Sequence, residues 1–328
     1  MYQMMSLPLY SGTLGEYDSW RDLGQELERL GCDGIEGVWG GEDLPKDLPA
    51  ELMLGYHLIF YPDWLDFYRD DRAALEQKFG SLEAVASFYG GLGPDTLLEQ
   101  YRADLRRAVN LGAHYVVFHV SDVSLEEGYT YRWLHTNQEV IDAAVEVVNL
   151  ILGEERWPFE FLVENQWWPG FTFTEPEETA RLLEGIRFAG KGILLDTGHL
   201  MNACTELKTE AEGADYIRRM LNRHGSLAKW VRGVHLHQSL SGAYVKAHTG
   251  SLPAGLPEDY MERFGVSYQH ILQIDQHRPW TDPAILPVLE QIEPRYLTHE
   301  LSSRGRMARA EAVSIQTRLL RQGGRMRV

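Results

Sequence analysis

Histidine, aspartate and glutamate residues recur at the ends of short apolar runs along this chain. The runs are LMLGYH, YVVFHV, EFLVE, LLDTGH, GVHLH and YLTHEL, and their polar residues are His57, His119, Glu164, Asp196, His199, His235, His237 and Glu300. Imidazole and carboxylate groups without cysteine suit Zn, Mn, Co, Mg or Fe(II), and several histidines favour Zn or Mn. The pattern therefore indicates metal-assisted chemistry with a bound divalent ion.

The elements that must position these residues alternate between strand and helix, which predicts a parallel sheet with crossover helices. We expect eight strands at 3–8, 33–38, 52–57, 115–120, 160–164, 192–197, 231–237 and 296–301. Helices are expected at 18–30, 70–79, 81–89, 95–111, 137–152, 175–189, 212–223, 281–291 and 306–321. This order fits an α/β fold of the (β/α)8 TIM-barrel type, and the GxGxxG turn of a Rossmann sheet is absent after the first strand.

Within several strands, the polar residue shares a face with the apolar residue two positions earlier. Leu162 precedes Glu164 in this way, and Leu194 precedes Asp196. In a barrel that face points inward, toward the end at which the strands finish. Buried acids and imidazoles gathered there are costly unless a cation compensates for their charge, so a divalent metal at this mouth is expected.

Length and composition favour one large α/β domain. The chain has 328 residues, 44% of them hydrophobic, and no low-complexity tract or linker divides it, so we expect a single TIM-barrel domain over 1–328. Two insertions interrupt the alternation, about 61–94 after the third strand and about 239–280 after the seventh. Both follow carboxyl ends of strands, where barrel enzymes build their active sites, which predicts lids and specificity elements, with oligomer contacts as the alternative.

The chain is acidic, with 31 basic and 48 acidic residues and a formal net charge of −17. Nucleic-acid-binding proteins carry basic surfaces because phosphate contacts supply most of their affinity, so DNA is disfavoured as a partner. No stretch approaches the roughly 20 apolar residues of a membrane helix, and the start, MYQMMSLPLY, has no secretory signal. Cys32 and Cys204 form no CxxC motif. We expect a cytoplasmic protein with no membrane partner, and a homo-oligomer is possible.

Further residues near the expected mouth are candidates for binding a substrate. Glu36 follows the second strand and could contact a hydroxyl group, or could be a solvated carboxylate at the rim. Tryptophans in loops after strands could form the walls of a small-molecule site or pack loop against loop; they are Trp39, Trp64, Trp167 and Trp168. Lys246 and Arg278 are candidate cations for a substrate phosphate, with a plain surface position as the alternative.

The motifs and their order resemble the xylose isomerase-like TIM-barrel superfamily, also called AP endonuclease family 2. The resemblance spans most of the chain and rests on VVFH at 116–119, LVEN at 162–165, LLDTGH at 194–199, VHLHQS at 234–239 and THEL at 298–301. The endonuclease IV branch adds a histidine after the third strand and an Asp-x-His after the seventh. His57 matches the first and Asp275-Gln276-His277 matches the second, across a long insertion.

This resemblance implies up to three metal sites. The implied ligand sets are His57, His119 and Glu164; Glu164, Asp196, His235 and Glu300; and His199, Asp275 and His277. The family motif His-Leu-x-Asp favours His235 as the ligand of the seventh strand, whereas an epimerase-like His-x-His motif favours His237. We prefer His235, which leaves His237 as a substrate contact or the alternative ligand.

Two reaction classes fit these residues. Clustered metals lower the pKa of bound water toward ~7 and clamp the attacking and leaving oxygens of an ester. The additional histidines favour metal-assisted hydrolysis of a small phosphoester or similar polar substrate. The alternative is a sugar or polyol isomerase or epimerase, which needs one metal in the four-ligand core. In both, Glu164 or Glu300 is the expected catalytic carboxylate. A catalytically idle barrel that binds a ligand is a third hypothesis, which intact rim residues disfavour.

Overall fold

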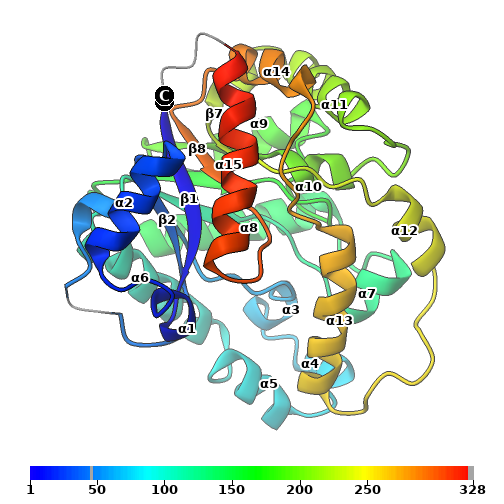
Figure 1. The fold of residues 1–328 in the computed structure, drawn as a ribbon. Coiled ribbons are helices and arrows are strands. Elements are labelled where there is room, and N and C mark those ends of the chain that lie inside the picture. Colours follow the sequence, from blue (N-terminus) through cyan, green and yellow to red (C-terminus); the bar gives the residue numbers. More distant parts are fainter. Residues whose placement is uncertain (45–46, 324–328) are drawn as a thin grey trace.

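Eight parallel strands close into a barrel at the centre of the molecule (Figure 1). The computed structural model describes residues 1–44 and 47–323. Each strand pairs with its neighbour in sequence, and β1 pairs with β8 to close the cylinder. The strands are β1 (Tyr2–Leu9), β2 (Gly34–Trp39), β3 (Met53–His57), β4 (Tyr115–His119), β5 (Glu160–Glu164), β6 (Lys191–Asp196), β7 (Val231–His235) and β8 (Tyr296–His299).

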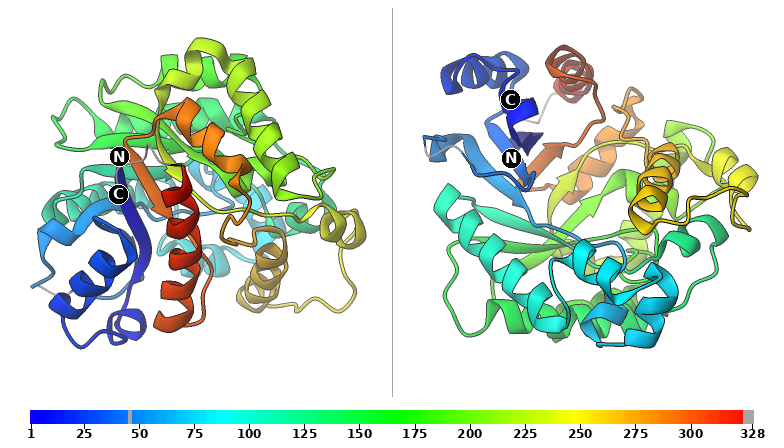
Figure 2. Two further views of the ribbon diagram at one scale, coloured as in Figure 1. Left: turned by 45° about the horizontal axis from the view of Figure 1, so that its top comes forward. Right: turned by 90° about the horizontal axis from the view of Figure 1, so that it is seen from below.

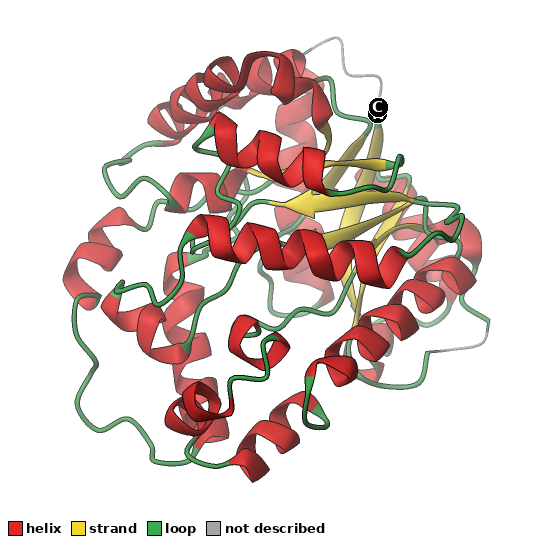
Figure 3. Ribbon diagram, turned by 180° about the vertical axis from the view of Figure 1, so that it is seen from behind, coloured by secondary structure: helices red, strands yellow, loops and turns green. Residues whose placement is uncertain are grey.

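Helices surround this barrel, as Figure 3 shows from behind, where red helices flank the yellow strands. The outer helices are α2 (Trp20–Leu30), α6 (Pro94–Leu111), α8 (Asn137–Leu152), α9 (Pro176–Gly185), α11 (Glu210–His224), α14 (Leu286–Ile292) and α15 (Arg306–Gln322). Local sequence explains their boundaries. Thr136 and Thr209 begin α8 and α11 with capping boxes, and Gly112 ends α6 with a φ of 80°, which a residue with a side chain rarely adopts. The (β/α)8 fold expected from the sequence is confirmed.

Two hydrophobic layers hold the barrel together. The larger lies between the strands and the outer helices. The smaller is separate and is formed by strand residues that point into the cylinder, namely Met4, Leu54, Tyr115, Val117, Leu162, Leu194 and Tyr296. Because side chains alternate along a strand, Glu164 and Asp196 point into the barrel one step beyond Leu162 and Leu194. The inner layer thus forms an apolar floor beneath the polar residues at the strand ends.

The segments after β3 and β7 fold into additional helices at the carboxyl end of the barrel. The first contains α3 (Leu65–Tyr68), α4 (Arg72–Phe79) and α5 (Leu82–Tyr89), and the second contains α12 (Gly242–His248) and α13 (Tyr260–Ile274). The two segments touch, since the rings of Phe79 and Tyr260 stack with centroids 3.8 Å apart and those of Phe88 and Phe264 lie 5.4 Å apart. Figure 2 gives further views of these helices. They form a wall beside the barrel mouth.

The helix α13 is the main element that the sequence analysis did not expect, because 239–280 reads as a segment rich in Gly, Pro and Tyr. Short helices after other strands were also not expected; they are α1 (Ser11–Leu14), α7 (Leu125–Thr130) and α10 (Thr197–Asn202). Between β2 and β3, the described residues contain a short 3-10 helix, η1 (Ala50–Leu52). Within residues 1–44 and 47–323, no helix combines the length and apolarity needed to cross a bilayer.

Candidate metal centre

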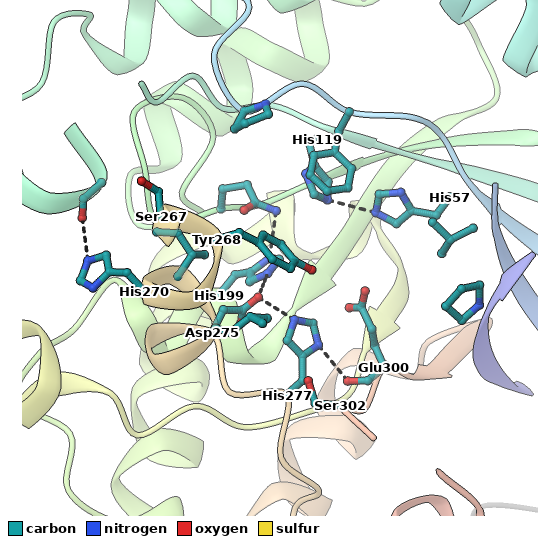
Figure 4. A pocket seen from close by; sticks show the side chains of 18 of the residues that line it. His57, His119, His199, Ser267, Tyr268, His270, Asp275, His277, Glu300 and Ser302 are labelled. Carbon is teal, nitrogen blue, oxygen red and sulfur yellow. Dashed lines mark hydrogen bonds and ion pairs between the residues drawn. The ribbon is translucent and has the colours of Figure 1, made fainter. Parts of the chain in front are cut away.

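Six imidazoles and four carboxylates gather at the carboxyl end of the barrel in three adjoining groups. In each group, the atoms that could bind an ion lie within 4.8 Å of one another. The groups are His57, His119 and Glu164; Glu164, Asp196, His235 and Glu300; and His199, His237, Asp275 and His277. Figure 4 shows how the side chains of His57, His119, His199, Asp275, His277 and Glu300 lie around the cavity. All nine residues expected as metal ligands are therefore brought together.

The first group joins the ends of β3, β4 and β5. His57 Nε2 and His119 Nε2 lie 3.0 Å apart, and Glu164 Oε2 is 3.4 Å from His57 Nε2 and 3.1 Å from His119 Nε2. His57 Nδ1 lies 2.8 Å from the carbonyl oxygen of Leu58, which accepts a hydrogen bond from that nitrogen. Nε2 of His57 faces the group, and with the Nδ1 proton held by this carbonyl it can offer its lone pair to an ion, as a ligand nitrogen must.

The second group places one imidazole nitrogen among three carboxylates. His235 Nδ1 is 2.9 Å from Glu300 Oε2, 3.5 Å from Glu164 Oε1 and 3.7 Å from Asp196 Oδ2. Glu164, Asp196 and His235 are fully buried at the ends of β5, β6 and β7, and Glu300 directly follows β8. Three negative groups at such short range repel one another, so this site requires positive charge at its centre.

The third group contains His237 in addition to the three expected ligands. Asp275 Oδ2 is 2.6 Å from His277 Nε2 and 3.3 Å from His199 Nε2, and the rings of His237 and His277 stack 4.0 Å apart. Gly198 makes room for the His237 ring, because a Cβ at position 198 would lie 2.0 Å from its Cε1 atom. His235 and His237, treated as alternatives from the sequence, thus lie in different groups.

Glu36 lies beneath the second group instead of at the rim. It is fully buried in β2, and its Oε1 is 2.8 Å from His235 Nε2, although the two are not aligned as a full hydrogen bond. Its other oxygen accepts hydrogen bonds from Tyr115 at 2.5 Å and from Thr298 at 3.0 Å. Glu36 therefore contacts the nitrogen of His235 that faces away from the group. This placement replaces the expected contact with a substrate hydroxyl.

Charges within the centre shift the pKa values of its members. Burial by itself would raise the pKa of Glu164, but the imidazoles of His119 and His235 outweigh burial and hold this pKa well below its usual range. Burial would lower the pKa of His277, but Asp275 overcomes it and raises this pKa to about 10. The carboxylates are therefore ionised, and in a metal-free protein protons on the imidazoles compensate for their charge.

Several oxygen and nitrogen atoms that could bind an ion are buried without a hydrogen-bond partner within the described residues. They are both Glu164 oxygens, Asp275 Oδ1, Glu300 Oε2, His235 Nδ1 and His237 Nδ1. Unpartnered buried acceptors are costly, and a divalent ion shared among carboxylates and imidazoles would satisfy them. The donor set, which contains nitrogen and oxygen and no sulfur, fits Zn or Mn.

A cavity of about 860 Å³ opens in front of these groups. Trp167 and Trp168 line it, as the sequence suggested. Trp64 instead packs between loops and donates its indole N–H to the carbonyl of Ser121 at 2.6 Å. Trp39 lies under the guanidinium group of Arg107, 3.6 Å from the centre of its ring. These last two tryptophans belong to the framework around the barrel and not to the cavity wall.

The two cations suggested for a phosphate lie away from this cavity. Lys246 is exposed and forms an ion pair with Glu206 at 2.6 Å. Arg278 forms an isolated bridge with Gln238 through its backbone, with an N–O distance of 3.1 Å. Neither residue lines the cavity. The proposed phosphate contact by these two side chains is therefore not supported by their positions.

Two amide side chains that sequence analysis did not select hold ligands in place. Asn165 donates to the carbonyl oxygen of Asp196 at 3.0 Å and accepts from its backbone N–H at 2.8 Å, which locks the end of β6 to β5. Gln166 Nε2 is 3.0 Å from His199 Nδ1. The motif LVEN, in which Asn165 follows Glu164, was the signal available for the first of these residues.

Comparisons with known proteins agree with this architecture. Residues 25–293 match the family model described as xylose isomerase-like TIM barrel. The structure resembles a D-tagatose 3-epimerase-like protein, with a TM-score of 0.54, 15% identity, and 99% of this chain and 98% of that chain covered. It resembles L-ribulose 3-epimerase, with a TM-score of 0.50, 12% identity, and coverage of 99% and 96%. For endonuclease IV from Thermus thermophilus, the TM-score is 0.49 at 16% identity, with 98% and 100% covered. No curated protein matches this sequence.

Proposed function

Because this chain belongs to the xylose isomerase-like TIM barrel family, we propose that it is a divalent-metal-dependent enzyme that hydrolyses a small phosphoester or a similar polar substrate. Zinc is the ion that the donor set favours, with Mn, Co, Mg or Fe as alternatives. The net charge of −17 disfavours DNA as the substrate. A small molecule that enters the 860 Å³ cavity is the expected partner.

The position of Glu164 carries this proposal. Its Oε2 faces His57 and His119 of the first group, at 3.4 and 3.1 Å. Its Oε1 faces His235 of the second group at 3.5 Å and His199 of the third at 3.1 Å. One buried carboxylate is thus shared by adjoining groups, which is the arrangement expected of a bridging ligand. A centre that holds one ion would leave the contacts of Glu164 with His57 and His119 without a function.

Ions bound here would polarise the reacting oxygen atoms of an ester and lower the pKa of bound water toward ~7. The chain itself would orient the ester and handle the proton. Glu300 lines the cavity, and the pKa of this carboxyl is lowered because the His235 imidazole beside it outweighs the effect of burial. Being ionised and at the cavity wall, Glu300 can accept a proton from an attacking water molecule. Trp167 would exclude bulk water beside His199, its ring centre lying 5.1 Å from that imidazole.

A sugar or polyol isomerase or epimerase is the second candidate. The group of Glu164, Asp196, His235 and Glu300 would by itself hold one ion with two glutamates available to move a proton. Two of the similar structures are those of a D-tagatose 3-epimerase-like protein and of L-ribulose 3-epimerase, and the similarity to them is one of fold. The first and third groups favour hydrolysis over isomerisation, because isomerisation at one ion would leave the histidines of these two groups without a function.

The number of bound ions tests the proposal. We expect elemental analysis of the purified protein to find two or three equivalents of divalent metal, together with metal-dependent hydrolysis of a small phosphoester such as p-nitrophenyl phosphate. The Glu164→Gln variant should lose hydrolysis and most of its metal together, because a carboxamide cannot bridge two cations. One equivalent of metal, with conversion of a ketose and no hydrolysis, would support the isomerase instead.

Glu160 offers a matched control on the same strand. It begins β5 at the opposite end of the barrel and forms ion pairs with Arg232 at 3.5 Å and with Arg295. Glu160→Gln removes the same charge from the same strand, and we expect full metal content. Full metal occupancy in Glu164→Gln would contradict the bridging role of Glu164.

A further inference from the structure

The cavity in front of the metal centre has a polar end and largely apolar walls. The candidate ligands form one end, as Figure 4 shows from close by. Aromatic rings supply much of the remaining wall, and they include Phe60, Tyr61, Phe88, Trp167, Trp168 and Phe264. At about 860 Å³, the cavity lies in the upper part of the range typical of small-molecule sites. The reacting group of a substrate would fill a small part of this space.

Aromatic rings contact the metal centre on two sides. The Phe60 ring lies 4.5 Å from the His119 ring and 5.8 Å from the His57 ring. Trp167 approaches His199 from another side, at 5.1 Å. Phe60 is 47% exposed although it is a large apolar residue beside buried polar ligands. Water that covers this ring is released when an apolar group replaces it, which favours binding of such a group.

Few charged or amide groups remain to recognise a polar substrate. Among the described residues that line the cavity there is no lysine, and Arg309 is the one arginine. Arg309 is 6% exposed and is ion-paired with Glu16. The amide of Gln166 is engaged with His199, 3.0 Å from its Nδ1. Phosphate groups beyond those that bind the ions directly would therefore find no free cation among the described residues of this wall.

We propose that the substrate of this centre carries an uncharged apolar group, of the size of an aromatic ring or larger, beside the oxygen atoms that bind the metal. This inference rests on the proposed metal-dependent function and defines its substrate class. It points to an ester with an apolar arm, not to a sugar or a sugar phosphate. Serine, threonine and tyrosine residues also line the cavity, but the rings of Phe60 and Trp167 lie directly beside the candidate ligands. Sugar hydroxyl groups placed against these two rings would lose water without recovering hydrogen bonds there, at a cost for each.

Hydroxamates of increasing size test this inference, because their polar head binds divalent metal ions. Affinities of acetohydroxamate, benzohydroxamate and gluconohydroxamate are measured calorimetrically with the zinc-loaded protein and with the chelator-treated protein. Burying an apolar side chain of phenylalanine size contributes about 1.5–3 kcal/mol, which corresponds to a gain in affinity of roughly tenfold to a hundredfold. We expect benzohydroxamate to exceed acetohydroxamate by this factor, and gluconohydroxamate to bind no better than acetohydroxamate.

Two variants test whether the gain in affinity of benzohydroxamate comes from contact with the cavity wall. Phe60→Ala should reduce the ratio of benzohydroxamate to acetohydroxamate affinity by at least about threefold, since it removes apolar contact area. Trp133 is a matched control, because it is 40% exposed and does not line the cavity. Trp133→Ala should leave the ratio at the value of the unmodified protein.

The outcomes separate the two proposals. Equal affinities for the acetyl and benzoyl compounds, or tighter binding of gluconohydroxamate, would overturn the apolar substrate class and leave the metal centre standing. Absence of zinc-dependent binding by acetohydroxamate would overturn the metal-dependent function. In that case, the ratio of benzohydroxamate to acetohydroxamate affinity in the chelator-treated protein still decides whether the cavity wall prefers an apolar group.

Discussion

Histidines of the candidate metal centre are oriented by contacts of the ring nitrogen that faces away from it. His57 Nδ1 and His277 Nδ1 lie 2.8 and 3.1 Å from the backbone carbonyl oxygens of Leu58 and Glu300, which accept their hydrogen bonds. His235 contacts a carboxylate instead, that of Glu36. Such contacts fix the tautomer and the ring orientation, and they raise the basicity of the nitrogen that binds the ion. We therefore expect residues outside the candidate ligand set to contribute to metal affinity.

We predict that Glu36→Gln weakens metal binding without loosening the fold. The carboxamide keeps the shape and a hydrogen-bond acceptor for Tyr115, but it removes the negative charge 2.8 Å from His235 Nε2. Losing such a partner typically lowers metal affinity about 10–100-fold. A chelator competition titration measures this loss, and the urea midpoint of the metal-free protein should change little. Unchanged affinity would show that Glu36 only fills space.

The sequence indicates which strand ends carry the candidate ligands, but it does not indicate the residues that support them. Alternation along a strand tells which residues point inward, so Glu164 and Asp196 could be placed from their strands alone. It does not tell how deep a residue lies along the barrel. Glu36 is the third residue of β2, three positions before this strand ends at Trp39, and its carboxylate contacts His235 from below. That depth follows from register between neighbouring strands, which one sequence does not reveal.

At the scale of elements, a buried charge cluster attaches the helices after β3 to the loop after β4. Lys78 Nζ of α4 lies 2.7 Å from Asp63 Oδ1 and 2.7 Å from Asp66 Oδ2. His135 Nε2 lies 3.2 Å from Asp66 Oδ1. Asp122 accepts hydrogen bonds from the backbone N–H groups of Trp64 and Leu65, where α3 begins, at 2.8 Å each. Because the loop with Asp122 directly follows His119, this cluster connects the inserted helices to the metal centre.

We predict that the contribution of His135 to stability depends on pH. Its hydrogen bond to Asp66 raises the pKa of His135 above the usual 6.5 despite opposing burial. A raised pKa in the folded state means that the stabilisation is complete below pH 6.5 and is lost as pH rises through the folded value. His135→Gln should therefore cost about 1 kcal/mol at roughly pH 5.5 and much less at roughly pH 9. Urea unfolding at both pH values measures the difference.

A second histidine provides the comparison for this experiment. His248 ends α12, is exposed, and lies outside the cluster. His248→Gln should change the free energy of unfolding little at either pH. The cluster would not act as described if His135→Gln destabilised the protein equally at both pH values, or more strongly at the higher one.

At the scale of the whole molecule, the regular alternation of strand and helix patterns made the barrel predictable. The irregular composition of the insertion after β7 gave no indication of its long helix. Each expected strand overlaps a strand of the structure, because buried parallel strands form apolar runs that turn residues interrupt. The helix α13 was not expected, since its sequence YMERFGVSYQHILQI contains a glycine and several aromatic or β-branched residues. Its stability comes from contacts such as the stacking of Tyr260 on Phe79 across two insertions. Such tertiary contacts leave no periodic pattern in the sequence.

The arrangement of ligands predicts that metal ions stabilise the entire barrel. They come from six consecutive strands, β3 to β8, and from the segment after α13, so each ion joins parts of the chain that separate on unfolding. At a free concentration a thousand times Kd, one ion stabilises the folded state by about 4.1 kcal/mol. With an unfolding entropy of about 2.1 cal/mol/K per residue, this corresponds to roughly 6 °C in the unfolding midpoint for each ion.

Thermal unfolding before and after chelation therefore measures how much the ions stabilise the folded barrel. We expect chelator treatment to lower the midpoint by several degrees for each ion removed, and added zinc or manganese to restore it. Glu164→Gln should abolish most of this metal-dependent rise, because Glu164 is shared by two of the ligand groups, whereas Glu160→Gln should retain it. Identical midpoints with and without the chelator, in a protein shown to lose its metal, would mean that the ions bind the unfolded chain as tightly as the folded barrel and do not stabilise it.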